Sequence, residues 1–282
     1  MFYQSNKGNH VLNSKILKTK DSSVQIMPMK KKSPLSFILP LVVILCVLLL
    51  WYIVCLFRFF PEYALPSPGS SLRALREILA GTLIKDIIAS LWRVCVGFVI
   101  SAGLGIPAGL WLGQNASARR ALVPLLQFFR FISPLAWIPF AILWFRIGDL
   151  PAIFLIFMAT FFLLTLSTMS AVANIPTIYF RVARDYNYTG MEKLSKVILP
   201  AVLPQVITAL RVSYGIAWVV IVAAEMVGCQ DGLGYGIWNA RNGLRLDIAV
   251  AYMITIGLLG IAIDRLLAQL TKQPSIRWHY ES

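Results

Sequence analysis

Arginine side chains inside apolar stretches are the residues of this sequence with the clearest capacity for chemistry. Arg93, Arg130 and Arg211 lie in long apolar runs, where a charge is costly and marks a candidate functional residue. A guanidinium presents a planar fork of N–H donors that fits a planar or tetrahedral oxyanion. Arg93 and Arg211 are therefore predicted to line a path for an anion. Arg93 has an alternative role in a structural ion pair with Glu225, and Arg130 could extend its head group to the membrane surface near the start of its run.

Proline and aromatic residues add candidates for the lining of the same path. Pro134 and Pro139 are five residues apart in one apolar run and must break or kink a helix. Backbone groups freed at membrane depth are tolerated only inside protein or against a cavity. Three aromatic residues could line such a cavity, although aromatic side chains in these stretches more often serve packing. They are Trp137, Tyr214 and Trp218.

No set of residues in the sequence has the spacing of a catalytic or metal site. The histidines, His10 and His279, stand in opposite tails, and the four cysteines show no metal-ligand spacing. The phosphate-binding pattern G-x-x-x-x-G-K-[ST] does not occur. We therefore predict no catalytic residue, no metal site and no cofactor in this chain.

The composition indicates that the elements that hold these residues in place are membrane helices. Hydrophobic residues make up 58% of the 282 residues and charged residues 13%, and the mean hydropathy is +0.74. Ordinary soluble domains have about 45–50% apolar and about 25% charged residues, and disordered chains are less hydrophobic still. The net charge of +14 would suggest a nucleic-acid partner in a soluble chain. In a membrane protein the basic residues instead report orientation, so no nucleic-acid partner is predicted.

Six apolar runs are long enough to cross a hydrocarbon core of about 30 Å. They cover residues 35–57, 86–112, 122–145, 151–172, 201–227 and 248–270. A cleaved signal peptide is the alternative for the first run. That run is longer than a signal core and lacks an A-x-A site after it, which favours an uncleaved span. The fold class predicted is an all-α polytopic membrane protein with six transmembrane helices.

The distribution of Lys and Arg predicts that both termini are cytoplasmic. Residues 1–34 form a basic, flexible tail, with attraction to anionic membrane lipid as a second role, and residues 271–282 form the other tail. Residues 58–85 form an extracytoplasmic loop with a short helix that starts at Ser70 or Ser71. This helix lies on the membrane surface or closes the rim of the bundle. Residues 86–270 form the core.

Glycines have two predicted roles in this core. The loop 228–246 is dense in glycine, and we expect non-helical backbone folded over the external mouth as a gate, with a flexible connector as the alternative. The gate candidates are Gly232, Gly234 and Trp238. Glycines within the spans are predicted to permit close helix packing. These are Gly97, Gly103, Gly105 and Gly109.

The longest cytoplasmic connection, residues 174–200, has the signals of two short helices. Pro176 suits the first turn of a helix through Arg184, and Asn187 lies where the chain must turn. Thr189 and Glu192 match a capping box that starts a second helix, which Leu199 and Pro200 end. These helices would have an apolar and a basic face outside the membrane, so a cytoplasmic partner is predicted.

This connection resembles the cytoplasmic loop of ABC importer permeases, which has the pattern E-A-A-x-x-x-G-x9-I-x-L-P. Ala183, Leu199 and Pro200 match the pattern, whereas Arg181 replaces the glutamate and reverses its charge. Asn187 replaces the glycine, and asparagine also accepts a left-handed turn. The resemblance implies that this loop couples to the ATPase. The coupling residues it implies are Arg181, Val182, Ala183, Arg184, Asn187, Gly190, Leu199 and Pro200.

Further segments between residues 61 and 270 are similar to the nitrate, sulfonate, taurine and bicarbonate branch of these permeases. They are Leu65–Pro68, Ser133–Pro139, Ala141–Phe145, Leu210–Trp218, Ala223–Met226 and Gly232–Asn242. The resemblance implies the type I importer fold in the inner (plasma) membrane. It also implies a homodimer with a second permease copy, two ATP-binding subunits that hold ATP and Mg, and an extracytoplasmic substrate-binding protein. Two alternatives stay open: a small organic cargo such as a thiamine precursor, and an ATP-independent channel or carrier.

Overall fold

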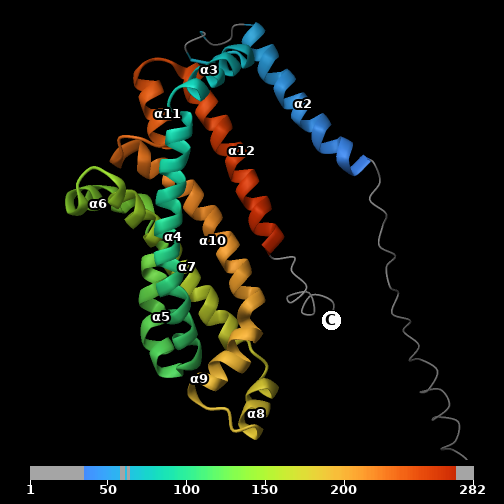
Figure 1. The fold of residues 1–282 in the computed structure, drawn as a ribbon, viewed down its shortest axis with the longest axis vertical. Coiled ribbons are helices and arrows are strands. Elements are labelled where there is room, and N and C mark those ends of the chain that lie inside the picture. The colour runs from blue at the N-terminus through green and yellow to red at the C-terminus, as the bar shows by residue number, and fades with distance from the viewer. Residues whose placement is uncertain (1–34, 58–60, 62–63, 271–282) are drawn as a thin grey trace, which may run out of the picture. The chain divides into compact units, whose positions relative to one another are not determined.

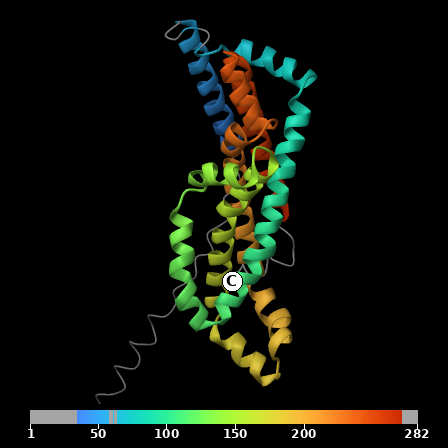
Figure 2. The same ribbon diagram turned by 90° about the vertical axis from the view of Figure 1, so that its left-hand side faces the viewer.

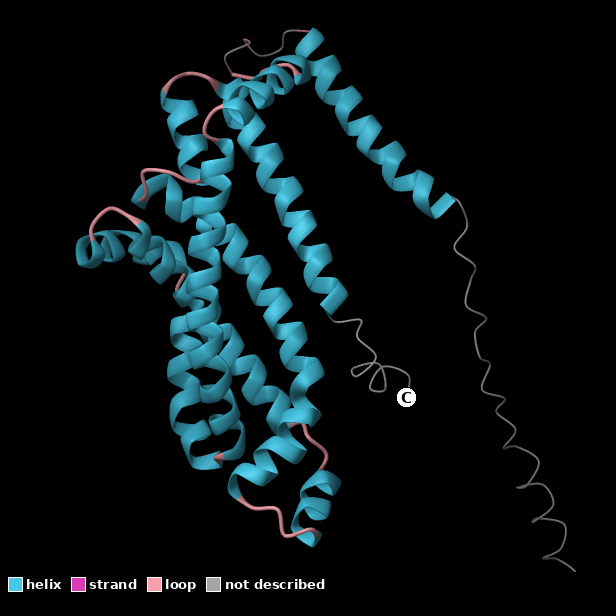
Figure 3. Ribbon diagram, in the orientation of Figure 1, coloured by secondary structure: helices cyan, strands magenta, loops and turns pink. Residues whose placement is uncertain are grey.

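The structure is a computed structural model and describes residues 35–57, 61 and 64–270. In these ranges every regular element is a helix (Figure 3). The chain divides into two units, residues 1–50 and 51–282. The described part of the first unit belongs to α2, Leu35–Leu56, whose stretch Leu39–Leu56 carries no charged residue. The predicted all-helical fold is confirmed. The predictions for the tails 1–34 and 271–282 fall outside the described residues, and the cytoplasmic placement of both termini stays a prediction.

Five helices of the described chain are long and apolar enough to cross a membrane, and a bent pair makes a sixth crossing if counted as one span. This agrees with the six predicted spans. The second unit contains α3 Pro68–Ala80, α4 Leu83–Gln114, α5 Ala116–Phe131, η1 Pro134–Trp137, α6 Ile138–Phe145, α7 Asp149–Ala173, α8 Thr177–Asp185, α9 Gly190–Lys193, η2 Leu194–Ile198, α10 Leu199–Gly228, α11 Leu233–Asn242 and α12 Leu246–Leu270.

The third span is broken where the two prolines predicted a break. α5 ends at Phe131, and the 3₁₀ turn η1 begins at Pro134. The helices on either side of this break meet at an angle of 83°. Pro139 fits in the first turn of α6, where its missing N–H breaks no helical bond. Figure 2 shows α5 running beside the bundle and α6 crossing it.

The core of the second unit is built where α4, α7 and α10 pack together. Gly105 and Gly109 face the backbone of α7, because a Cβ at Gly109 would lie 2.6 Å from the carbonyl oxygen of Thr165. A Cβ at Gly97 would likewise lie 2.9 Å from Ile156. The predicted role in close packing is confirmed for these three glycines. It is wrong for Gly103, around which a Cβ would meet nothing within 4 Å.

The predicted helix of the outer loop is α3, but it starts earlier than expected. Ser67 caps it by accepting a hydrogen bond from the backbone N–H of Ser70 at 3.2 Å, and Pro68 occupies the first turn. The prediction of Ser70 or Ser71 as the cap is wrong because proline already has the backbone angle of a first helical residue. Ala74 and Ile78 are buried, and α3 packs on α12 and α4. This helix therefore closes one end of the bundle.

Residues 228–246 differ from the expected non-helical loop, because most of them form the helix α11. This helix packs on α12, α10 and α4. In Figure 1, α3 and α11 lie toward one end of the second unit, and α8 and α9 lie at the opposite end. The loop helices α8 and α9 therefore lie far from α3 and α11 within this unit.

The second helix of the loop 174–200 does not stop at Leu199 and Pro200 as predicted. α9, the π-helical turn η2 and α10 form one continuous stretch of 39 residues, Gly190–Gly228. The N–H of Leu199 donates to the carbonyl oxygen of Leu194, five residues back. Such a wide turn accommodates the proline that follows it, because a proline ring clashes with the carbonyl four residues earlier in a regular helix.

The contact between α4 and α7 gives a testable prediction from paired glycine substitutions. We expect Gly109→Ala to lower the free energy of unfolding by about 1–3 kcal/mol, because its Cβ enters occupied space. Gly103→Ala is the matched control and should be neutral or stabilising by about 0.5–1 kcal/mol, because alanine is the better helix former. Thermal unfolding of the two purified variants in detergent measures the difference. Equal unfolding midpoints would contradict the assigned packing.

Candidate functional site

A network of charged side chains connects several transmembrane helices around the buried Arg93 and Glu225. Only 3% of the Arg93 side chain on α4 is exposed. Its Nη1 donates to Glu225 Oε1 on α10 at 2.8 Å, and its Nε donates to Asp149 Oδ1 at the start of α7 at 2.7 Å. Its Nη2 also contacts the carboxylate of Asp231, which precedes α11. One guanidinium on α4 therefore connects the start of α7, the end of α10 and the turn that leads into α11.

The first turn of α11 is attached to this network through its backbone. Gly234 N–H donates to Glu225 Oε2 at 2.9 Å, and Leu233 N–H donates to Ser90 Oγ at the same distance. Gly232 has φ of +105°, and a Cβ there would lie 2.7 Å from Arg93 Nη1. Only glycine has both the backbone freedom and the space at this position. The network therefore fixes where α11 starts.

The structure confirms the predicted pair of Arg93 and Glu225 and adds two partners that the sequence did not reveal. Asp149 and Asp231 stand outside the apolar runs, so hydropathy gave no reason to connect them with Arg93. Because three carboxylates occupy the Arg93 guanidinium, these contacts do not support its predicted role in an anion path, which stays a prediction. The gate function of Gly232, Gly234 and Trp238 also stays a prediction.

Arg211 has an acidic partner as well. Its Nε and Nη2 donate to the two carboxylate oxygens of Asp264 at 2.8 and 2.7 Å, which joins α10 to α12. This two-point geometry is the one that a guanidinium would offer an oxyanion. In the structure, the carboxylate of Asp264 on α12 accepts both of these hydrogen bonds. The role of Arg211 in a path stays a prediction.

The aromatic path candidates lie among packed side chains. Trp218 on α10 is buried and donates from Nε1 to the carbonyl oxygen of Ile256 at 3.2 Å. Tyr214 meets Phe98 edge to face, with ring centroids 5.3 Å apart. Trp137, just after Pro134 in η1, contacts neighbouring aromatic rings. These contacts are typical of packing residues, and packing was the alternative role predicted for these aromatic side chains.

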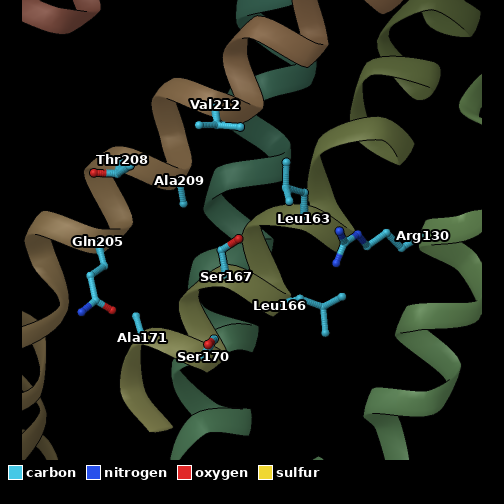
Figure 4. A pocket seen from close by; sticks show the side chains of 10 residues that line it. All are labelled: Arg130, Leu163, Leu166, Ser167, Ser170, Ala171, Gln205, Thr208, Ala209 and Val212. Atoms are coloured by element: carbon cyan, nitrogen blue, oxygen red, sulfur yellow. The ribbon is translucent and has the colours of Figure 1, made fainter. Parts of the chain in front are cut away.

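A cavity of about 450 Å³ lies between α5, α7 and α10 (Figure 4). Arg130 extends into it from α5, and Ser167, Ser170, Gln205 and Thr208 supply polar groups from the other two helices. Its remaining lining is apolar and consists of Leu163, Leu166, Ala171, Ala209 and Val212. The cavity thus combines one cation with hydroxyl and amide groups.

The loop of residues 174–200 is an ordered helix–turn–helix. α8 runs from Thr177 to Asp185, close to the predicted bounds, and Asn187 makes the turn with φ of +55°. Asparagine therefore replaces the family's glycine without loss of the left-handed turn. Ala183 is only 1% exposed, whereas the two preceding residues of α8, Arg181 and Val182, are exposed. Ala183 therefore packs within the loop, and its role in coupling stays a prediction.

An apolar groove of about 560 Å³ opens on this loop. It runs between α8 and the start of α10, with Lys196 as the cationic group on its wall. The other lining residues are Ile178, Tyr179, Val182, Tyr186, Tyr188, Val197, Pro200 and Ala201. In the described chain, no group of three or more His, Cys, Asp or Glu side chains could hold a metal ion.

The Arg93 network gives a prediction about stability. Arg93→Met should lower the free energy of unfolding by about 3–5 kcal/mol, because it leaves the fully buried Glu225 without a cation. Glu225→Gln should cost less, because Asp149 and Asp231 still neutralise Arg93. The double variant should be more stable than Arg93→Met alone, as unfolding in detergent can measure. A double variant that is no more stable than Arg93→Met would contradict this account.

Comparison with known proteins identifies the family. The family model described as "Binding-protein-dependent transport system inner membrane component" matches residues 105–274. The nitrate import permease protein NrtB of Synechocystis is 32% identical over 88% of this chain and 95% of its own. The bicarbonate transport system permease protein CmpB of Synechococcus elongatus is 37% identical over 84% of this chain and 89% of its own. The taurine transport system permease protein TauC of Escherichia coli is 29% identical over 83% and 87%.

A solved structure supports the fold independently. The MetNI methionine ABC transporter in an inward-facing crystal form contains a chain that superposes with a TM-score of 0.56. The match covers 70% of this chain and 99% of that chain at 21% identity, which supports the fold alone. The family match and the identities to the relatives decide the assignment. This chain belongs to the binding-protein-dependent inner-membrane components, the permease subunits of ABC importers, and resembles their nitrate, bicarbonate and taurine branch.

Proposed function

We propose that this permease imports a small oxyanion such as nitrate, bicarbonate, or taurine or another aliphatic sulfonate. The observation that carries the proposal is the set of three relatives named for nitrate, bicarbonate and taurine, each of which matches more than four fifths of this chain. All three cargoes carry a small charged group with several oxygen atoms. An organic cargo such as a thiamine precursor is the alternative that the uptake experiment below decides.

The proposed complex contains partners at both ends of the bundle. Two ATP-binding subunits, which hold ATP and Mg, dock on the loop formed by α8 and α9. The exposed apolar residues Ile178, Val182 and Met191 on that loop support this docking, because such residues outside a membrane favour a protein partner. A second copy of this chain completes the path, and an extracytoplasmic binding protein delivers the cargo at the end formed by α3 and α11.

The proposed mechanism is rigid-body rocking driven by the ATPase. α9, η2 and α10 are continuous, so a displacement of the docking loop is passed directly into a helix of the core. The same helix carries Glu225, whose contacts with Arg93 and Gly234 reach α4 and α11. Closure of the ATPase pair would therefore move both ends of the bundle together and alternate access to the path.

Uptake measurements test the cargo. Cells that express this permease with its ATPase and binding protein should accumulate labelled nitrate, bicarbonate or taurine, and depletion of ATP should abolish the uptake. Cells that lack the permease are the control. Uptake of a thiamine precursor and none of the three anions would overturn the proposed cargo, and uptake that persists without ATP would overturn the importer mechanism.

Copurification tests the docking surface. Val182 is 45% exposed on α8, so Val182→Asp places a charge in the proposed contact without filling the core, and it should abolish copurification of the ATPase subunit. Leu244→Asp is the matched control at the opposite end. Leu244 is 78% exposed with φ of +55°, which aspartate tolerates, so this variant should retain the ATPase. Retention of the ATPase by both folded variants would place the docking surface elsewhere.

A further inference from the structure

Arg130 differs from the other two arginines of the apolar stretches in having no acidic partner in the described chain. Arg93 is surrounded by three carboxylates, and Arg211 holds Asp264 at two points. Among residues 35–57, 61 and 64–270, no carboxylate lies within ion-pair distance of Arg130. Unpaired charges inside a membrane protein are costly and usually face a water-filled cavity or a substrate path.

The position of Arg130 excludes the explanation suggested by its sequence. The predicted span began at Leu122, two turns before Arg130, but α5 begins at Ala116. Arg130 is the fifteenth of sixteen residues in α5, about 21 Å along the axis from the first. The helix then ends at Phe131, and the chain bends by 83°. The side chain therefore cannot extend back to the membrane surface at the start of α5.

The cavity that receives Arg130 is suited to an anion. Its polar lining consists of the guanidinium, the hydroxyls of Ser167, Ser170 and Thr208, and the amide of Gln205, and it includes no carboxylate. Thr208 Oγ1 donates to the carbonyl oxygen of Pro204 at 3.0 Å, whereas the guanidinium of Arg130 has no hydrogen-bond acceptor within the described part of the chain. The cavity is open and Arg130 is exposed, and the volume of about 450 Å³ leaves room for a small hydrated anion.

We propose that this cavity is a recognition site for the transported oxyanion, with Arg130 as the residue that contacts it. The proposal rests on the proposed function and assigns the anion contact to α5, α7 and α10. The fork of Arg130 would bind two oxygens of a nitrate, bicarbonate or sulfonate group. Ser167 and Gln205 would donate to the remaining oxygens. The mixed wall of the cavity, with one cation and several apolar side chains, allows release as well as binding.

The test compares two substitutions of Arg130 in the complete transporter. Arg130→Gln should lower the maximal rate of labelled nitrate, bicarbonate or taurine uptake about tenfold or more, the usual effect of losing a charged hydrogen-bonding partner. The half-saturating external concentration should stay constant if the binding protein sets it. Arg130→Lys keeps the charge but loses the fork, so it should retain an intermediate rate.

Arg120→Gln is the matched control, because Arg120 and Arg130 are both exposed arginines on α5, and only Arg130 lines the cavity. It should transport at the wild-type rate. ATPase copurification and the unfolding midpoint of each variant report assembly and folding. A wild-type rate for Arg130→Gln would overturn the recognition site. So would a loss of transport that merely follows a loss of folded, assembled protein.

Two further outcomes distinguish this proposal from a wrong cargo and from lipid binding at Arg130. If the wild-type transporter takes up none of the three anions, the proposed function fails, and the comparison of Arg130 variants is then made on the cargo that is taken up. If Arg130 instead holds a phospholipid phosphate, vesicles of anionic lipid should stabilise the wild type more than Arg130→Gln, while uptake stays equal. That result would overturn the substrate contact.

Discussion

The requirement that a charge within a membrane must find a partner organises this permease. Arg93 meets it with Glu225, Asp149 and Asp231, and Arg211 meets it with Asp264. The first cluster connects α4, α7, α10 and the start of α11, so its electrostatic energy also determines which helices adjoin. Arg130 is the exception in the described chain, and its lack of an acidic partner is the reason why we propose an anion as the occupant of its cavity. Three arginines that look alike in the sequence thus have different roles because their neighbours differ.

Close backbone contact is the second condition on the fold. Gly97, Gly105 and Gly109 allow α4 to approach α7, and side-chain packing then extends from α7 to α10. Without water to drive apolar surfaces together in a membrane, such contact relies on dispersion and on small residues. The rigid core formed in this way can transmit movement from the loop of α8 and α9, because its helices are too tightly packed to deform independently.

Much of the architecture could be predicted from local sequence, because the hydrocarbon core imposes long apolar helices and prolines interrupt them. The break after Phe131 and the left-handed turn at Asn187 follow from single residue types. The failures arose where distant segments decide the outcome. α11 was mistaken for irregular loop because its glycines provide space for Glu225 and Tyr252 and not flexibility. The burial of Ala183 and the contacts of Asp149 and Asp231 likewise depend on neighbours that the sequence does not place.

The π-helical turn η2 determines the rotation of the docking loop about the axis of α10. Each residue of an α-helix turns the chain by about 100°, and a π turn contains one residue more than an α turn. The residues Leu194–Ile198 therefore act as an angular offset between α9 and the faces of α10 that meet α4, α7 and α12. Over a helix of about 58 Å, this offset determines which side of α9 lies in line with each packed face of α10, although the two ends never touch.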